Sequence, residues 1–442
     1  MKPGPALLLA LALLLALGLV LALQRGLQWP ADLPLGMVWL AAATGLGLAA
    51  LLDGWRARRE APLTLQRRLP RSLALGRDNR IGLHLANPLV RRVQGRVVDH
   101  YPAGLAISGL PRRFSLSAGG ELDFDYRVEP TRRGELRFGA TELEIDSPWG
   151  FWRRRILQAG DSSLRVYPDF ITPGDLREIS AEHSARRLGI HLQRRRGEGT
   201  DFLQLREFRQ GDSLRQVDWK ASSRLCKPVS RDYQDEHDRD IIFLLDCGRR
   251  MHGRDGRLSH FDHALNAMLL TAWFALREGD GVGVCTFAGE ERWLEPRRQR
   301  AGLRILLDQL YDLQATTQGS DFIEAAMRLA DRRQRRALVI LVTNLQAEDA
   351  ADLERAVAVL GQQHAVLLAN LRETELSHWA GAGIDSFDHA LLHCVAADLL
   401  RRQQRVIARL RARGIGVVDC LPHQLSRSLA SQYMSMKRSG TV

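Results

Sequence analysis

The chain begins with two long, uncharged runs of apolar residues. The first extends over residues 6–23 and the second over residues 33–52. At a rise of about 1.5 Å per residue, a helix of about 20 residues spans the roughly 30 Å hydrocarbon core of a bilayer. The segment between the runs contains Trp29 and Pro30, which suit a turn at a membrane interface. This pattern predicts a transmembrane helical hairpin within residues 1–59.

Basic residues flank both ends of the predicted hairpin. Lys2 precedes the first run, and Arg56, Arg58 and Arg59 follow the second. Because lysine and arginine concentrate in cytoplasmic loops, both ends are expected to face the cytoplasm. The alternative for the first run is a secretory signal peptide, since a lysine followed by a leucine-rich run is typical of one. In both cases we expect a protein of the bacterial inner membrane, multi-pass in the first case, whose large domains are cytoplasmic.

Residues 60–170 change to a period of two. Apolar residues alternate with other residues over 81–85 and again over 122–128, and turn-forming residues such as those at 118–120 separate the runs. Short alternating strands at this spacing predict an antiparallel β-sandwich of immunoglobulin-like type. We expect this β module to act as a spacer or an interaction surface.

Residues 240–442 alternate continuous apolar runs with amphipathic segments. The expected strands lie at 241–245, 282–287, around 293, 337–343, 365–370 and 415–418, and the expected helices include 260–277, 301–313 and 321–330. Continuous apolar strands that alternate with helices predict a doubly wound, mostly parallel α/β sheet. Ligands of such sheets bind at the carboxyl ends of the strands, so the residues directly after each strand matter most.

Charge and cysteine content narrow the possible partners. The formal net charge is +12, and all but four of the basic residues are arginines. Such a surplus suits anionic lipid or nucleic acid. The arginine-rich segment 171–200 is better explained as a solvated face, so we expect no nucleic-acid partner. The five cysteines include no C-x-x-C pair, which argues against a disulfide framework and a structural zinc site.

The residues after the first strand of the predicted sheet resemble the von Willebrand factor A fold. That family holds a divalent cation with an aspartate, two serines, a threonine and a second aspartate. The matching positions here carry Asp246, Gly248, Arg250, Ser320 and Asn344. Hard cations require several carboxylate and hydroxyl oxygens, so we expect this degenerate site to bind no metal. Arg250 or Arg249 is expected to pair with Asp246 and to replace the charge of the ion.

Residues 201–224 carry the most specific motif of the chain. They read DFLQLREFRQGDSLRQVDWKASSR and closely resemble the signature of the DUF58 family, approximately L-R-E-Y-x-x-G-D-x-x-R-x-I-x-W-K-x-x-A-R. Phe208 and Ser223 are mild departures from it. Tyr433 and Lys437 resemble the closing Y-x-x-x-K of the same family. The resemblance covers essentially the whole chain, with the signature region at 171–239 and an A-like domain at 240–442.

The charged and aromatic residues of the signature form the candidate site. They are Arg206, Gly211, Asp212, Arg215, Trp219, Lys220 and Arg224. Gly211-Asp212 favours a turn, in which Asp212 could accept charge-assisted hydrogen bonds from arginine. One interpretation is a buried structural clasp with Trp219 as its apolar plate. The other is a partner-binding surface, since arginine and tryptophan are favoured interface anchors. Both stay open at this point.

The sequence contains no recognisable catalytic motif, such as G-x-S-x-G, H-E-x-x-H or a Walker loop, and we expect neither an enzyme nor a cofactor. The DUF58 resemblance implies a membrane-anchored protein-binding module that works with a MoxR-type AAA+ ATPase in the assembly or maturation of other proteins. The expected partners are that ATPase and membrane lipid, with no small-molecule substrate. The alternatives are an arginine-rich nucleic-acid-binding protein at the membrane and an enzyme of envelope metabolism.

Overall fold

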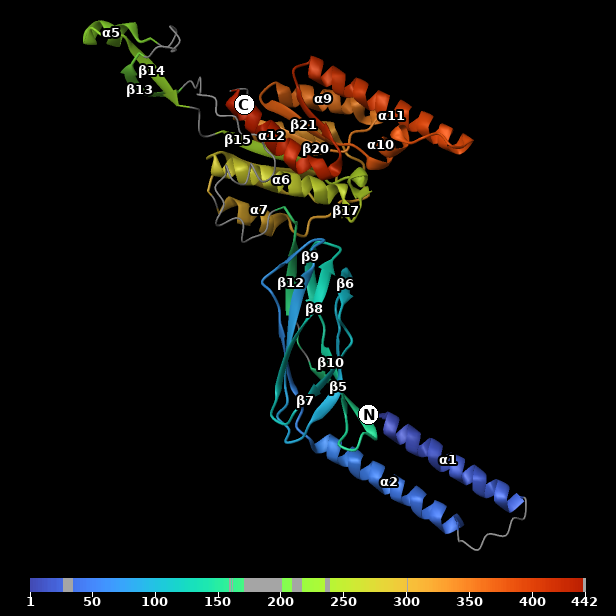
Figure 1. The fold of residues 1–442 in the computed structure, drawn as a ribbon. Helices are drawn as coiled ribbons and strands as arrows, with labels where there is room; N and C mark the ends of the chain where they lie inside the picture. The colour runs from blue at the N-terminus through green and yellow to red at the C-terminus, as the bar shows by residue number, and fades with distance from the viewer. Residues whose placement is uncertain are drawn as a thin grey trace. The chain divides into compact units, whose positions relative to one another are not determined.

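The computed structural model describes residues 1–26, 35–158, 160, 162–170, 201–208, 217–234, 239–299 and 301–439. The chain divides into two compact units, Met1–Tyr167 and Pro168–Val442. The first unit holds two apolar helices and a β-rich region, and the second holds a mixed α/β sheet (Figure 1). At this level the predicted fold class is confirmed.

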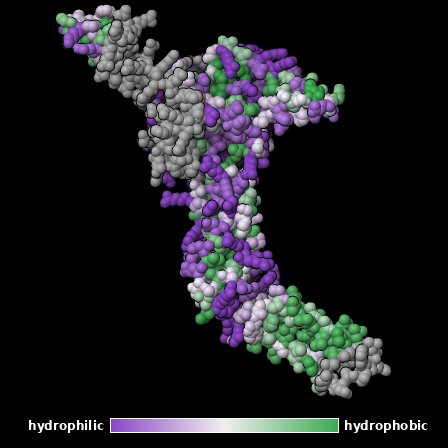
Figure 2. Space-filling model, viewed as in Figure 1, coloured by the Kyte–Doolittle hydropathy of each residue, from purple (hydrophilic) through white to green (hydrophobic). Residues whose placement is uncertain are grey.

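The two apolar helices are α1 (Pro5–Gly26) and α2 (Leu35–Arg59). Both are long and apolar enough to cross a membrane, which suggests membrane association, although a signal sequence meets the same criterion. Apolar side chains cover the surface of both helices (Figure 2). Nε1 of Trp39 on α2 donates a hydrogen bond of 2.9 Å to the carbonyl oxygen of Leu14 on α1. Gly18 leaves room for this indole, so the two helices pack closely together.

The C-terminal end of α2 is attached to the β-rich region through Asp53. This side chain is fully buried and accepts a hydrogen bond from Oγ of Ser147. The residues before α1 reach the same region, because β1 (Lys2–Pro3) pairs antiparallel with β11 (Trp152–Gln158). Nε1 of Trp152 also donates to the carbonyl oxygen of Ala50 on α2, at 2.7 Å. The residues before α1 and the C-terminal half of α2 therefore both contact β11.

The β-rich region contains three sheets, with strand orders β1-β11-β10-β5-β7, β2-β4-β8-β6 and β3-β12-β9. The strands are β2 (Thr64–Arg68), β3 (Leu73–Ala74), β4 (Asn79–Ala86), β5 (Val93–Asp99), β6 (Leu105–Ser108), β7 (Arg112–Leu116), β8 (Glu121–Pro130), β9 (Gly134–Phe138), β10 (Thr141–Asp146) and β12 (Ser162–Tyr167). The period-two pattern marks the buried face, since Ile81, Leu83 and Leu85 are at most 1% exposed. Asp99 lies in this interior and accepts hydrogen bonds from Arg67 and Tyr126.

The second unit starts with a short antiparallel hairpin and continues with a six-stranded sheet of order β19-β18-β15-β20-β21-β22. The hairpin consists of β13 (Asp201–Glu207), α5 (Trp219–Leu225) and β14 (Val229–Gln234). The sheet strands are β15 (Asp240–Asp246), β18 (Gly281–Phe287), β19 (Trp293–Arg297), β20 (Leu338–Thr343), β21 (Ala365–Leu371) and β22 (Gly416–Cys420). Neighbours are parallel except β18 and β19, as the apolar runs predicted.

Helices cover both faces of this sheet and bury separate clusters of apolar side chains. One face packs against α6 (His260–Arg277), α7 (Gly302–Leu310) and α12 (Leu425–Arg438). The other packs against α8 (Phe322–Arg332), α9 (Ala350–Gly361) and part of α11 (Phe387–Ala412). The remaining elements are β16 (Arg254–Asp255), β17 (Leu258–Ser259), α10 (Thr374–Gly381), η2 (Arg249–His252), η3 (Ala347–Asp349) and η4 (Pro422–Gln424).

Candidate functional site

Asp246 is the centre of a buried cluster at the carboxyl edge of the six-stranded sheet. Its residue surface is 1% exposed. Oδ1 accepts hydrogen bonds from the backbone nitrogen of Gly248 at 2.8 Å and from Oγ of Ser320 at 2.7 Å. Oδ2 accepts a third from Oγ1 of Thr343 at 2.6 Å. Neutral donors from three segments of the chain thus satisfy the carboxylate, as a buried charge requires.

Gly248 is required by the close approach of these segments. A Cβ atom at this position would lie 2.3 Å from Oγ of Ser320 and 3.0 Å from Oδ1 of Asp246. A serine, which a cation site of the predicted type would use at position 248, therefore cannot enter without displacing Ser320. The glycine thus permits the hydrogen bond between Ser320 and Asp246.

The predicted pairing of Arg250 or Arg249 with Asp246 is wrong. Neither arginine forms an ion pair with Asp246 among the residues that the structure describes. Arg250 pairs with Asp349 instead, and its Nη2 lies 3.5 Å from a carboxylate oxygen of Glu348. Burial raises the pKa of Asp246, and the hydrogen bonds and the charge of Arg250 offset this rise only in part.

Asn344 turns away from Asp246. Its Oδ1 accepts a hydrogen bond of 2.9 Å from Nε2 of Gln346, and its Nδ2 lies 3.1 Å from Nδ1 of His260. Burial lowers the pKa of His260 and thereby favours the neutral ring, which can accept from the amide. Asp246, Ser320 and Asn344 are the matched positions whose side chains carry an oxygen atom that could bind a cation. Of these three, the structure brings only Asp246 and Ser320 together. It adds Thr343, whose only sequence signal is its place at the end of an apolar run.

The donor set around Asp246 does not fit a hard divalent cation. Both carboxylate oxygens are occupied as acceptors, and two of the matched positions carry Gly248 and Arg250. Such cations need several oxygen ligands with free lone pairs. Across the described ranges, no group of three or more His, Cys, Asp and Glu side chains could hold a metal ion.

The structure describes part of the predicted signature site. Arg206 lies on β13, where its backbone pairs with Ser230 of β14. Trp219 begins α5, and Asp218 caps this helix by accepting hydrogen bonds of 3.0 Å from the backbone nitrogens of Lys220 and Ala221. The side chain of Trp219 is 71% exposed, which differs from the buried plate that a clasp would need.

The other members of the predicted site divide into two groups. Lys220 and Arg224 are exposed on α5, on the same short helix as Trp219. Gly211, Asp212 and Arg215 lie outside the described residues, and the hydrogen bonds expected for Asp212 stay a prediction.

Tyr433 and Lys437, which form the C-terminal motif, lie one helical turn apart on α12 and meet at Asp280. The Tyr433 hydroxyl donates to Oδ2 of Asp280, and Nζ of Lys437 lies 2.9 Å from the same oxygen. Nζ also donates to the carbonyl oxygen of Glu278 at 3.1 Å. Burial and the negative charge of Asp280 raise the pKa of Tyr433 and keep the phenol protonated. The motif therefore fastens α12 to the turn that precedes β18.

Residues 204–383 match DUF58. The family model is described as a protein of unknown function, and the matched residues make up less than half of the chain. No curated protein matches the chain.

Solved structures show only weak likeness to this chain. A Salmonella alpha-2-macroglobulin reacted with methylamine has a TM-score of 0.20 at 21% identity, covering 24% of this chain and 7% of its own. The conserved hypothetical protein BatB from Bacteroides thetaiotaomicron has a TM-score of 0.28 at 16% identity, covering 46% and 99%. The mussel byssus proximal thread matrix protein 1 has a TM-score of 0.26 at 12% identity, covering 46% and 47%. Scores this low establish neither a shared fold nor a shared function.

Proposed function

We propose that this chain belongs to the DUF58 family and is a membrane-anchored protein-binding module that works with a MoxR-type AAA+ ATPase in the assembly or maturation of other proteins. In this proposal the α/β unit is a von Willebrand factor A-like domain that binds proteins without a metal ion and catalyses no reaction. The ATPase is implied by the resemblance of residues 201–224 to the family signature.

The hydrogen bonding of Asp246 is the observation that carries the proposal. In the A fold, a cation holds together the loops at the carboxyl edge of the sheet and offers a vertex to the partner. Here Ser320, Thr343 and the backbone of Gly248 hold the equivalent loops directly through the carboxylate. A rigid loop edge that needs no ion supports a metal-independent docking role.

The anchor follows from the two apolar helices and their flanking charges. Arg56, Arg58 and Arg59 lie in the last turn of α2, and Lys2 precedes α1. Basic residues at both ends favour a cytoplasmic location for both, beside anionic lipid. The pairing of β1 with β11 supports retention of α1, because cleavage after it would remove a paired strand. Trp219, which is 71% exposed, is the proposed contact of the signature region.

Co-purification in detergent tests this function. The full chain would be expressed with a MoxR-type AAA+ ATPase from the same organism, and the complex would be trapped with a non-hydrolysable ATP analogue. We expect the ATPase to be retained, also after EDTA treatment, and Trp219→Ala to weaken retention. Trp149→Ala is the matched control, because Trp149 is 45% exposed on the other unit. Loss of the ATPase from the unmodified chain would refute the partnership, and EDTA-sensitive retention would refute metal independence.

A further inference from the structure

Helix α11 carries an apolar stripe that nothing covers within the described residues. Leu391, Val395 and Leu399 recur every four positions and therefore share one face of the helix. They are 55%, 51% and 36% exposed, and Phe387 at the start of α11 is 82% exposed. Figure 2 shows apolar residues gathered over this end of the helix. The C-terminal half of α11 packs against the sheet through Ile407 and its buried neighbours.

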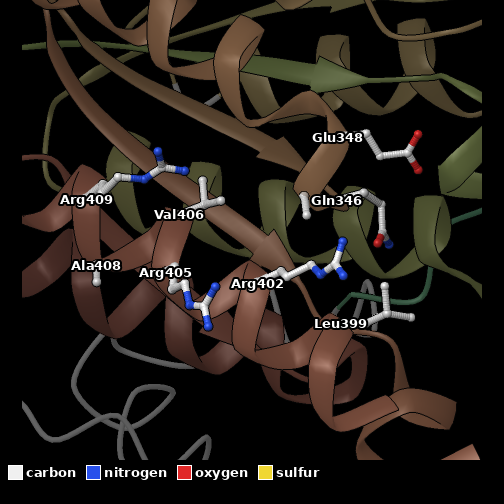
Figure 3. A pocket seen from close by; sticks show the side chains of 9 residues that line it. Gln346, Glu348, Leu399, Arg402, Arg405, Val406, Ala408 and Arg409 are labelled. Atoms are coloured by element: carbon white, nitrogen blue, oxygen red, sulfur yellow. The ribbon is translucent and has the colours of Figure 1, made fainter. Parts of the chain in front are cut away.

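The stripe leads into a groove between α11 and η3. The groove has a volume of about 950 Å³, and Leu399 contributes apolar surface to it, while Val406 at its base is buried against the sheet (Figure 3). Three arginines of α11 also line it, namely Arg402, Arg405 and Arg409. One long helix therefore presents an apolar half followed by a basic half.

Arg402 and Arg405 are available to a partner. Arg402 pairs with Asp398 at 2.7 Å, and both side chains are more than half exposed. Exposed ion pairs contribute only about 0–1 kcal/mol, so a partner carboxylate can displace this one at little cost. Arg409 pairs at 3.3 Å with Glu354, whose side chain is only 14% exposed, so this arginine is held within the chain. Arg405 has no ion pair among the described residues. Arginine binds carboxylates with two parallel hydrogen bonds, which makes it an effective anchor for acidic side chains.

We infer that the stripe and the groove bind an amphipathic helical segment of a partner protein, with an apolar face and acidic residues at the end that meets the arginines. From Phe387 to Val406, α11 rises by roughly 29 Å at about 1.5 Å per residue, which matches a partner helix of about 20 residues. The inference rests on the proposed protein-binding function, and it specifies the surface and the chemistry of the bound segment.

A flat lipid surface fits this geometry less well. A helix that lies in a bilayer interface has basic residues beside its apolar face along its whole length. Here Leu391 and Val395 come first along the helix, and Arg402 and Arg405 follow on the same side. The arginines also line a concave groove, which suits a protruding segment.

Peptide binding to the full chain in detergent tests the inference. The probe is a labelled helical peptide of about 20 residues with a leucine face and one glutamate-rich end, and its control carries lysine in place of glutamate. Fluorescence anisotropy should show that the acidic peptide binds and the basic one does not. We expect Val395→Glu and Arg402→Glu/Arg405→Glu to weaken binding by about tenfold or more, as for other truncated or reversed interface anchors. Met327→Glu, at an exposed position of α8, should change nothing.

Two results would overturn the inference: equal binding of both peptides, or binding that is unaffected by Arg405→Ala and the double variant. A photo-crosslinker at Leu391 of the chain in cells gives a second test. An adduct with an acidic amphipathic segment of another protein supports the inference, whereas adducts with lipid or with a second copy of the chain contradict it. The peptide assay contains no ATPase, so a failed co-purification alongside successful peptide binding would refute only the ATPase partnership.

Discussion

Thr343, at the end of β20, donates a hydrogen bond of 2.6 Å to Oδ2 of Asp246, at the end of the neighbouring strand β15. The bond joins two parallel strands through their side chains at the edge where their loops begin. Water cannot replace it, because Asp246 is 1% exposed and Thr343 is fully buried. Removing the donor of a buried acceptor therefore destabilises the fold, whereas an exposed acceptor would bind water instead.

Replacing Thr343 with valine should destabilise this edge by about 1–3 kcal/mol, the cost of leaving a buried carboxylate oxygen unsatisfied. Hydrogen exchange in the full chain measures the effect, and amides of β15 and β20 should exchange faster. Thr317→Val is the control, since Thr317 is exposed in the loop before Ser320. Unchanged exchange in Thr343→Val would show that this bond does not stabilise the edge.

Gly248→Ala should disrupt the bond between Ser320 and Asp246, because the new Cβ would lie 2.3 Å from Oγ of Ser320. Overpacking of this kind costs about 1–3 kcal/mol. A double-mutant cycle of the free energy of unfolding with Ser320→Ala should show strong coupling. Gly319→Ala is the matched control, since its Cβ would meet nothing within 4 Å. Additive effects of Gly248→Ala and Ser320→Ala would contradict the steric explanation.

Lys437→Met should loosen the C-terminal end of α12, while its apolar face still packs against the sheet. It leaves the side chain of Asp280, which is 1% exposed, without its cation. Breaking a buried pair on one side costs about 3–5 kcal/mol. Tyr433→Phe removes one hydrogen bond to the same carboxylate, which Lys437 still neutralises, and should cost about 1–3 kcal/mol.

Limited proteolysis of the C-terminal segment should follow the order Lys437→Met, then Tyr433→Phe, then the unmodified chain. Lys227→Met is the control, because the ion pair of Lys227 with Glu207 is exposed. Equal proteolysis of Lys437→Met and Lys227→Met would show that the C-terminal motif does not fasten the helix.

The second unit should lose stability as the pH falls below about 6.5. Burial lowers the pKa values of His260 and His263, so the unfolded chain takes up protons at a higher pH than the folded one. The stability is fully present above the unfolded pKa and is lost progressively toward the lower folded values.

His260→Asn should reduce this pH dependence, measured as the difference in unfolding temperature between pH 7.5 and 5.5. His252→Gln serves as the control, since His252 is exposed on η2. Asp246 has the opposite sign, because its raised pKa makes its ionised form costly as the pH rises. If His260→Asn keeps the full pH dependence of the unfolding temperature, a group other than His260 causes it.

The strands of the second unit were predictable because their apolar runs are continuous. Continuous apolar runs such as 241–245 and 337–343 are typical of strands that are buried on both faces, and both runs form strands of the sheet. The loss of cation ligands at positions 248 and 250 was also visible in the sequence.

The partners of the charged residues were not predictable from local pattern. Arg250 follows Asp246 by four positions, yet it pairs with Asp349, which is 99 positions from Arg250. The donor that Asp246 uses instead, Thr343, is 97 positions away. Such choices depend on which loops the folded sheet brings together. The exposure of the α11 stripe was also not predictable, because apolar periodicity alone indicates a buried helix face.

The pairing of β1 with β11 sets an order of events during synthesis. Lys2 and Pro3 are synthesised well before their partners Trp152 and Arg153, which are made only after most of the β-rich region. Until then, β11 is absent and the first residues have no strand to join. When it arrives, β1 pairs with Trp152 and Arg153 at the start of its outer edge, the kind of edge that otherwise recruits strands from other chains. Residues 2–3 thus cover part of a strand that is synthesised much later.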